Sequence, residues 1–241
     1  MIIVQRGIIM SLFDLIKSLY GKDEELNMYN KNYEEKLLKK YGKCNSINGD
    51  IKLLIIADTH GALNEGDFKD FMMNNQEYDA CIMLGDHYDR DINIILNYVD
   101  KNKLYGILGN HDYSYLENYN IRNINGEVIT INGINILGME GSFRYKPVKF
   151  PSFSQEESIT FFQDKVGVDV LISHDTKFDL NKCNRDPAHQ GLVGITNYLY
   201  EKKIPIHIHG HIHENYDNKL LNDTVEHSVF GYRIINIKKT S

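Results

Sequence analysis

The chain has 241 residues, of which 42% are hydrophobic and 25% charged, and its formal net charge at pH 7 is −6. A chain of this size and composition can bury a globular core without disulfide bonds. The acidic balance argues against an extended nucleic-acid-binding surface. No apolar run approaches the roughly 18 residues of a membrane helix, so we expect no membrane partner.

The three cysteines, Cys44, Cys81 and Cys183, are far apart and form no CxxC pair. This pattern indicates reduced thiols and excludes both a disulfide framework and a thiolate zinc site. Arg6 and Asp14 interrupt the apolar start of the chain, and no small-residue cleavage site follows them. We therefore expect a cytoplasmic protein without a secretory signal peptide.

Residues 1–47 are expected to form a helical extension. Ile8, Leu12 and Leu15 recur at spacings of four and three, as on one face of a helix. A second helical stretch ends at Gly42, a residue type that commonly terminates helices. We expect the extension to pack against the core, and it is also the place where an oligomer contact would form.

Residues 48–241 are expected to form a single α/β domain. Apolar runs typical of strands buried on both faces alternate with helix-like stretches in its first half: strands at 51–57, 79–84 and 103–109, helices at 64–76 and 90–102. In the second half, Asn132-Gly133 predicts a hairpin between two β-rich runs. Further buried strands are predicted at 168–174 and 204–210, a helix after Gly194, and one or two closing strands at 224–238.

Several of these apolar runs end in Asp, Asn or His. The polar residues that follow them are, in chain order, Asp58 and His60, Asp86 and Asp89, Asn110 and His111, His174, and finally His211 and His213. Ligands of open α/β sheets bind at the carboxyl ends of the strands, so we expect these side chains at one rim. A buried carboxylate cluster would repel itself unless metal ions neutralised it.

Mixed oxygen and nitrogen ligands suit manganese, iron or zinc. One aspartate of the set, with two oxygens, is able to bridge two ions, and a two-metal site clamps an ester oxygen and generates a hydroxide nucleophile near neutral pH. A mononuclear zinc hydrolase is the alternative, but it leaves the motifs around Asp86 and Asn110 unexplained.

Taken together and in order, these motifs resemble those of the calcineurin-like metallophosphoesterases. The matching segments are Asp58-Thr59-His60, Gly85-Asp86 with Asp89, Gly109-Asn110-His111-Asp112, His174, and Gly210-His211-Ile212-His213. The resemblance covers roughly residues 51–237. It implies a four-layer α/β/β/α sandwich of two mixed sheets flanked by helices, and a pair of divalent metal ions.

The resemblance also implies a role for each position. The first ion would be held by Asp58, His60 and His213, the second by Asn110, His174 and His211, and Asp86 would bridge them. His111 would act as the general acid, and Asp89 would orient it. Asn110 and Arg90 would also contact the substrate, although Asp91 stands where the protein-phosphatase branch has a glycine after this arginine.

The implied activity is hydrolysis of a phosphate ester by attack of a metal-bound hydroxide, with manganese as the first candidate metal and iron, zinc or nickel as alternatives. The first hypothesis is a phosphomonoesterase, including the Ser/Thr protein phosphatase type, that acts on a small phosphorylated substrate or a phosphoprotein. A phosphodiesterase for a nucleotide or other small diester is the alternative within this class. A non-catalytic metal-binding scaffold is the alternative of another class.

Other residues have less specific expectations. His207 and His209 lie further back in the same strand and are expected to have structural roles, for example as hydrogen-bond partners of the ligands. His87 is expected to be a partly exposed turn residue. The segment 143–153, which carries Arg144, Lys146 and Lys149 among aromatic residues, forms either a cationic rim for a phosphorylated ligand or a plain surface loop.

Overall fold

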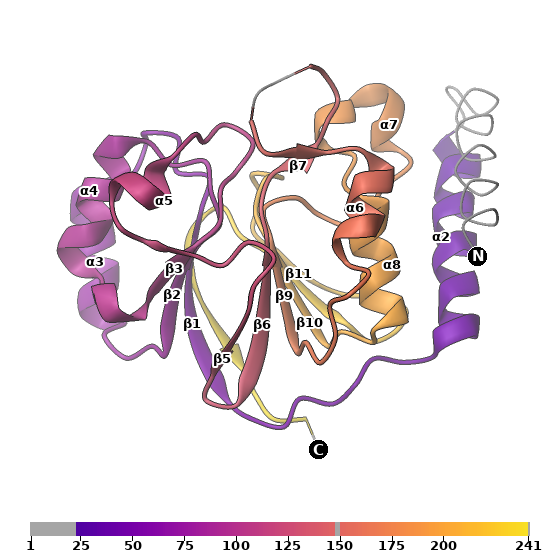
Figure 1. Ribbon diagram of the computed structural model, residues 1–241, viewed down its shortest axis with the longest axis horizontal. Helices are drawn as coiled ribbons and strands as arrows, with labels where there is room; N and C mark the ends of the chain where they lie inside the picture. Colours follow the sequence, from indigo (N-terminus) through magenta and orange to yellow (C-terminus); the bar gives the residue numbers. More distant parts are fainter. Residues whose placement is uncertain (1–22, 148–149, 241) are drawn as a thin grey trace.

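The structure is a computed structural model that describes residues 23–147 and 150–240 (Figure 1). Its first half contains α2 (Asp23–Tyr41), β1 (Ile51–Ala57), α3 (Glu65–Asn74), β2 (Ala80–Met83), α4 (Asp89–Tyr98), the 3-10 helix η1 (Lys101–Lys103), β3 (Leu104–Gly106), α5 (Tyr115–Asn118), β4 (Arg122–Asn123), β5 (Val128–Ile131) and β6 (Ile134–Met139). Its second half contains β7 (Ser142–Phe143), β8 (Ser152–Phe153), α6 (Gln155–Phe161), β9 (Val170–Ser173), α7 (Lys182–Arg185), the 3-10 helix η2 (Pro187–His189), α8 (Val193–Glu201), β10 (Ile206–His209), β11 (Tyr216–Lys219), β12 (Val225–Ser228) and β13 (Gly231–Ile237). The helical pattern predicted around Ile8 lies outside the described residues.

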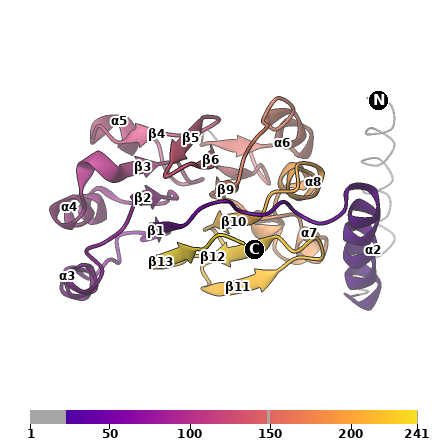
Figure 2. The ribbon, with the colours of Figure 1, turned by 90° about the horizontal axis from the view of Figure 1, so that it is seen from below.

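Two mixed sheets face each other. A five-stranded sheet has the order β13-β1-β2-β3-β4, and a six-stranded sheet has the order β11-β12-β10-β9-β6-β5. Figure 2 shows the helices α3, α4 and α5 on the outside of the first sheet, and α6 and α8 on the outside of the second. The predicted four-layer α/β/β/α sandwich is confirmed. In the described ranges, no helix is long and apolar enough to cross a membrane.

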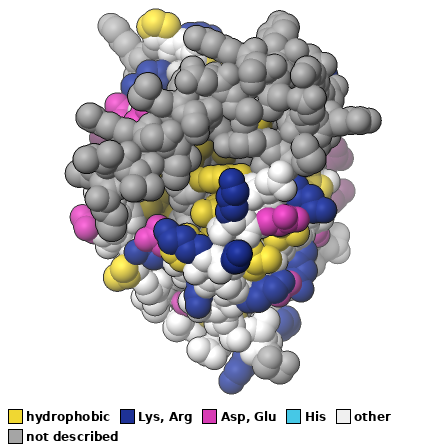
Figure 3. All heavy atoms as spheres, turned by 90° about the vertical axis from the view of Figure 1, so that its right-hand side faces the viewer, with side chains coloured by type: hydrophobic (Ala, Val, Ile, Leu, Met, Phe, Trp, Pro, Cys, Tyr) yellow, Lys and Arg dark blue, Asp and Glu magenta, His cyan; other side chains and the backbone are white. Residues whose placement is uncertain are grey.

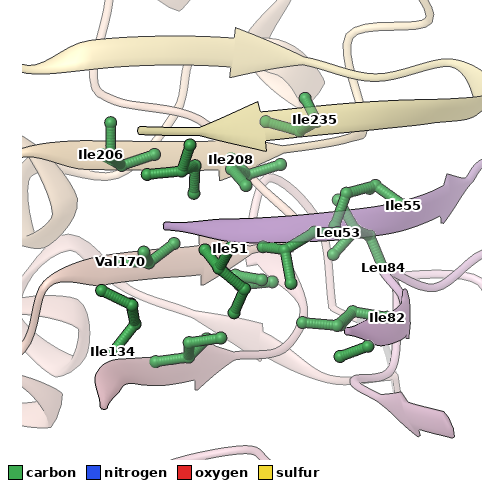
Figure 4. Packing of buried hydrophobic residues seen from close by; sticks show 14 of the residues in the cluster. Ile51, Leu53, Ile55, Ile82, Leu84, Ile134, Val170, Ile206, Ile208 and Ile235 are labelled. Atoms are coloured by element: carbon green, nitrogen blue, oxygen red, sulfur yellow. The ribbon is translucent and has the colours of Figure 1, made fainter. Parts of the chain in front are cut away.

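The core between the sheets explains why the apolar runs are continuous. Leu53 and Ile55 of β1 belong to the central cluster between the sheets, whereas Leu54 and Ile56 belong to the cluster under the outer helices. Both sides of β1 are therefore apolar, as expected for a strand covered on both faces. Figure 4 shows Leu53 and Ile55 lying toward residues of the second sheet, such as Ile208. Each such side chain contributes roughly 1.5–3 kcal/mol when buried.

The predicted hairpin is present between β5 and β6. Asn132 and Gly133 both have positive φ, 51° and 79°, and Ile131 pairs with Ile134 across the turn. Two consecutive positive φ values define the turn whose twist suits a two-residue hairpin, and Asn-Gly is the dipeptide that adopts it most readily. The short strands β4, β7 and β8 and the edge strand β11 were not predicted from the sequence.

Helix α2 packs on the outer side of α8. Glu34 forms an ion pair with Lys177 at 2.8 Å and accepts a hydrogen bond from the hydroxyl of Tyr200 at 2.7 Å. Gly42 has a positive φ of 82° and its N–H bonds to Leu38 O, which confirms the predicted helix end. Figure 3 looks onto this face, where Lys and Arg side chains lie among apolar ones. The domain boundary at residue 47 stays a prediction.

Candidate metal centre

The predicted ligands lie in loops at one edge of the two sheets. These loops follow β1, β2, β3, β9 and β10 and carry Asp58 and His60, Asp86, Asn110, His174, and His211 and His213. Strands β1, β2 and β3 are parallel in one sheet, and β9 and β10 are parallel in the other. Parallel strands deliver their carboxyl ends to a shared edge, and the two edges meet here.

Asp58, His60 and His213 form the first group. The Nε2 atoms of His60 and His213 are 3.1 Å apart, and Asp58 Oδ1 lies 3.9 Å from the former and 3.7 Å from the latter. Two ligands of one ion, each bound at about 2.0–2.2 Å, are roughly 3.0–3.5 Å apart. The three atoms are therefore close to the spacing that one ion requires.

Asp86 stands between this group and a second one. Its Oδ2 atom lies 3.7 Å from His60 Nε2 and 3.6 Å from His174 Nε2. Asn110 Oδ1 lies 2.8 Å from the same His174 nitrogen. One carboxylate thus faces both groups, which is the position of a bridging ligand.

Hydrogen bonds determine which nitrogens of His174 and His211 carry a proton. His174 Nδ1 lies 2.8 Å from Leu84 O, and His211 Nε2 lies 2.9 Å from Ala188 O. A carbonyl oxygen only accepts, so both nitrogens are N–H donors. Burial keeps both rings neutral, so His174 Nε2 and His211 Nδ1 keep their lone pairs. The His174 Nε2 lone pair then faces Asn110 Oδ1, also an acceptor, at 2.8 Å, which a shared cation would relieve. Second hydrogen bonds like those to Leu84 O and Ala188 O typically orient metal-binding histidines.

The hydrogen bonding of the Asp58 and Asp86 carboxylates shows whether a metal ion fits the site. Asp58 Oδ2 accepts a hydrogen bond from the backbone N–H of His211 at 2.8 Å. Asp86 Oδ1 accepts one from the backbone N–H of His111, also at 2.8 Å. Asp58 Oδ1 and Asp86 Oδ2 are buried without any hydrogen-bond partner. A buried charge without a partner is costly, and a cation would supply the missing partner. The donor set therefore fits metal ions.

The backbone is strained where the ligands lie. Nine non-glycine residues in the described ranges have a positive φ, and five of them are predicted ligands: Asp58, His60, Asp86, His211 and His213. Each such residue costs on the order of 1–3 kcal/mol, and strain of this kind concentrates at functional sites.

Burial shifts the pKa values of the candidate ligands. It raises the pKa of Asp58 well above its usual value, and the nearby Asp86 carboxylate adds to the shift. Burial also lowers the pKa of His174 well below its usual value and that of His211 to about 4. Both histidines are therefore neutral near pH 7, the form that binds metal ions.

Two buried carboxylates fix the loops without facing the ligand groups. Asp112 accepts the N–H groups of Asp86, His87 and Gly109 at 2.6, 3.1 and 2.7 Å. Asp112, which the sequence analysis placed in the motif of His111 without a role of its own, joins the His111 loop to the loop after β2. Burial raises the pKa of Asp112 to about 7 despite these bonds.

Asp91 has the same kind of role in the β1 loop. It is fully buried and accepts the N–H groups of Gly61 and Leu63 at 2.6 and 3.2 Å. Sequence reasoning noted Asp91 only as a departure from the family pattern. Its position two residues after Asp89, at the start of α4, was the available signal.

His111 is exposed at the rim of the site. Its ring lies edge-on to that of His60, with centroids 5.9 Å apart. Asp89 is exposed as well, and its carboxylate forms a hydrogen bond with the hydroxyl of Tyr119. Among the described residues, no hydrogen bond or ion pair joins Asp89 to His111, so the orienting role of Asp89 stays a prediction.

A family model for the calcineurin-like phosphoesterases matches residues 51–215. The chain belongs to this family. It is therefore a metal-dependent hydrolase of phosphoric esters, and the donor groups around Asp58 and Asp86 are its candidate metal site. No curated protein matches this phosphoesterase significantly by sequence.

Solved structures resemble the phosphoesterase in fold at low sequence identity. A dimetal phosphatase from Danio rerio has a TM-score of 0.53 and 10% identity, covering 80% of this chain and 100% of that one. The protein TT1561 of Thermus thermophilus has a TM-score of 0.50 and 9% identity, covering 78% of this chain and 98% of that one. At such identities, the likeness shows the fold alone.

Arg90, predicted to contact substrate, lies against the β1 loop. Its Nη1 donates to the carbonyl oxygens of Gly61 and Leu63, both at 2.9 Å, and lies 3.2 Å from Asp91. These contacts hold the loop that follows Asp58. They lend no support to the predicted contact with phosphate.

A small cavity of about 80 Å³ adjoins the rim. Asn110, His111, Lys146 and Phe150 are among its lining residues. The 143–153 segment therefore reaches the site, as one of the two sequence interpretations expected. Arg144 of this segment instead pairs with Glu157 at 2.8 Å, and Lys149 lies outside the described residues.

The expectation that His87 is partly exposed is wrong. His87 is buried, bonds through Nδ1 to Thr59 Oγ1 at 2.8 Å, and has a pKa lowered to about 3 by burial. His207 and His209 make no hydrogen bond to the candidate ligands within the described ranges; they contact a separate set of residues. The positive φ of His211 ends the strand, so the alternating histidines do not form a single row.

His189 lies beside the candidate ligands. Its ring centroid is 4.7 Å from that of His211, and its Nδ1 lies 2.7 Å from Asp186 Oδ2. Gly210 leaves room for a ligand side chain. A Cβ at Gly210 would lie 2.5 Å from Asp58 Oδ2, so only glycine leaves room for that carboxylate.

Proposed function

We propose that this phosphoesterase hydrolyses phosphomonoesters at a centre of two divalent metal ions. One ion would be held by Asp58, His60 and His213, the other by Asn110, His174 and His211, with Asp86 shared between them. The observation that carries the proposal is the pair of buried carboxylate oxygens, Asp58 Oδ1 and Asp86 Oδ2, which lack hydrogen bonds and face imidazole nitrogens.

Bound ions would lower the pKa of a water molecule and neutralise charge on the phosphoryl oxygens. The chain's own residues do the remaining work. His111, at the exposed rim, would donate a proton to the leaving oxygen. The hydrogen bond from its backbone N–H to Asp86 Oδ1 fixes the position of His111 relative to the shared carboxylate. Asn110 would orient the phosphoryl group through its amide.

The cavity beside His111 supports a monoester. Its lining by Asn110, His111 and Lys146 suits a phosphoryl group. Lys146 at the cavity would attract the second negative charge that a monoester carries and a diester lacks. A small phosphorylated molecule and the phosphorylated side chain of a protein both present this group.

The ligand types of the proposed dinuclear centre suit several metals, and we propose manganese as the first candidate. Every candidate ligand supplies oxygen or imidazole nitrogen and none supplies sulfur, which suits manganese, iron, zinc or nickel. Metal analysis of the protein as purified would rank them.

The compartment and the association state are further proposals. Cys44, Cys81 and Cys183 are all unpaired, which suits the reducing cytoplasm. An oligomer contact through residues 1–47 would be tested by light scattering of the full chain and of a chain lacking residues 1–22. An unchanged association state would remove those residues from the contact.

The test of the proposed function compares a phosphomonoester with the matching diester. The protein is stripped of metal, refilled with manganese, and assayed with alkyl and aryl esters. We expect the monoester to be preferred, and His111→Ala to lose most of its activity on the alkyl ester, whose leaving group needs a proton. Preference for the diester would replace the proposal with a phosphodiesterase.

The control for this test is Tyr113→Phe. Tyr113 is exposed and lies in the same loop as His111, but no chemical role is proposed for it. Its activity should equal that of the wild type. An equal loss in both variants would mean that the loop, and not the imidazole, supports the reaction.

A further inference from the structure

A second buried group of metal-binding side chains lies on the six-stranded sheet, and the proposed phosphatase reaction does not use it. His207 and His209 of β10 and Glu226 of β12 are each at most 1% exposed. His207 pairs directly with Glu226 in the parallel register of the two strands. Their ligand atoms all lie within 4.8 Å of one another.

Hydrogen bonds determine the protonation of His207. The hydroxyl of Ser173 donates its proton to Asp175 O at 2.6 Å. It can therefore only accept from His207 Nε2, which lies 2.8 Å away. With its proton on Nε2, neutral His207 presents a lone pair on Nδ1. That atom lies 3.4 Å from Glu226 Oε1 and has no hydrogen-bond partner.

A hydrogen bond also determines which nitrogen of His209 carries the proton. Its Nδ1 lies 2.9 Å from the carbonyl oxygen of Gly210, so Nδ1 carries the proton. Nε2 then has the lone pair and lies 3.8 Å from the same Glu226 Oε1. The hydroxyls of Tyr216 and Thr176 are 3.3 and 3.4 Å from Nε2, long distances for hydrogen bonds to a buried nitrogen.

Two imidazole lone pairs and one carboxylate oxygen therefore converge. Glu226 Oε1 is buried and has no hydrogen-bond partner. Lone pairs and a carboxylate charge that face one another repel unless a metal cation or an additional proton lies between them. Ligands of one zinc ion at about 2.0–2.2 Å are roughly 3.3–3.5 Å apart in tetrahedral geometry. The observed 3.4 and 3.8 Å are close to this spacing.

A cavity of about 420 Å³ adjoins the group on the side of Glu226. Glu226, Thr176 and Tyr216 are among the residues that line this cavity. Lys177 also lines it, but its ammonium group is paired with Glu34 at 2.8 Å, which offsets the repulsion of an incoming cation.

We propose that His207, His209 and Glu226 form a zinc site separate from the dinuclear centre. Two histidines and one glutamate are a zinc-binding set, and a buried site without sulfur suits this metal. The ion would join β10 to β12. Because the loop after β10 carries His211 and His213, an occupied site would also stiffen the strand that leads into this loop.

The decisive test is a crystal of the wild-type protein grown with zinc, with data collected on both sides of the zinc absorption edge. We expect an anomalous peak between the three side chains, at about 2.0–2.2 Å from each ligand atom. A crystal with zinc at the dinuclear centre and none between these residues would overturn the proposal. This test needs no variant, so a folding defect cannot obscure it.

Zinc content in solution provides the second measurement. After dialysis against excess zinc, Glu226→Gln should hold one ion fewer per chain than the wild type. The control Glu117→Gln removes an exposed carboxylate on α5 and should hold the wild-type number. Equal zinc content in Glu226→Gln and the wild type would show that protons, and not a metal, neutralise the group. Loss of zinc here with unchanged phosphatase activity would leave the proposed function intact.

Discussion

Asp86 accepts the backbone N–H of His111 through Oδ1 at 2.8 Å, while its Oδ2 is buried and unpartnered between His60 and His174. One carboxylate therefore positions the proposed general acid and faces both groups of candidate ligands. We therefore predict that metal binding and proton donation are coupled, because displacement of Asp86 would move His111 as well.

Asp112 is expected to stabilise the fold without contacting substrate. Its carboxylate accepts three buried N–H groups, and leaving such donors unpaired costs roughly 1–3 kcal/mol each. Asp112→Ala should therefore lower the free energy of unfolding by at least about 2 kcal/mol in urea denaturation. Asp164→Ala, which removes an exposed carboxylate, is the control, and equal stability of the two variants would contradict the account.

Metal uptake should depend on pH through Asp58. Its pKa is raised, mainly by burial, so the metal-free protein holds a proton on Asp58 at pH values where a free aspartate is ionised. Metal binding must displace that proton, and affinity should therefore rise with pH, by up to about tenfold per unit. His211, whose pKa is about 4, is already neutral above pH 5 and adds little to the slope.

The measurement is manganese affinity by calorimetry between about pH 5 and pH 7, in two buffers of different ionisation enthalpy. Proton release should accompany binding in the wild type and should be smaller in Asp58→Asn. An affinity that does not change with pH would show that Asp58 is ionised before the metal binds.

Gly210→Ala should weaken metal binding. The added methyl group would lie 2.5 Å from Asp58 Oδ2 and 3.1 Å from Ala57 Cβ, so the Asp58 carboxylate must move. Overpacking of this kind costs about 1–3 kcal/mol, which predicts metal affinity lower by about tenfold or more. Gly66→Ala in α3 has more space and should keep wild-type affinity. Unchanged affinity in Gly210→Ala would show that Asp58 has room to adjust.

Arg90→Ala separates the two roles suggested for this arginine. Its Nη1 contacts two carbonyl oxygens of the β1 loop, so the substitution should lower Tm, with a stability loss of about 1 kcal/mol, and leave KM nearly unchanged. Arg122→Ala, at an exposed ion pair elsewhere, is the control. A raised KM at unchanged Tm would restore the predicted contact with phosphate.

The sequence was most informative where a pattern is local. The continuous apolar run 51–57 predicted β1 because both faces of that strand are covered, and Asn132-Gly133 predicted a hairpin because both residues adopt positive φ readily. The candidate ligands were found because each follows a strand whose end reaches the same edge.

Contacts that depend on which loops meet were not predictable in this way. Asp91 and Asp112 each bond to backbone groups about 25–30 residues away in sequence. Glu226 meets His207 only because β12 lies beside β10 in the sheet. Their residue type gives no indication of a buried position, since aspartate and glutamate are exposed in most contexts.

The most direct measurement compares the wild type with Asp86→Asn after removal of metal and refilling with manganese. Bound manganese per chain and hydrolysis of a chromogenic phosphomonoester are measured on the same samples, with the exposed Asp70→Asn as control. We predict two ions and turnover in the wild type and the control, and loss of at least one ion and of about 100-fold or more in kcat/KM in Asp86→Asn. Two ions and full turnover in Asp86→Asn would contradict the central claim that this carboxylate organises a dinuclear catalytic centre.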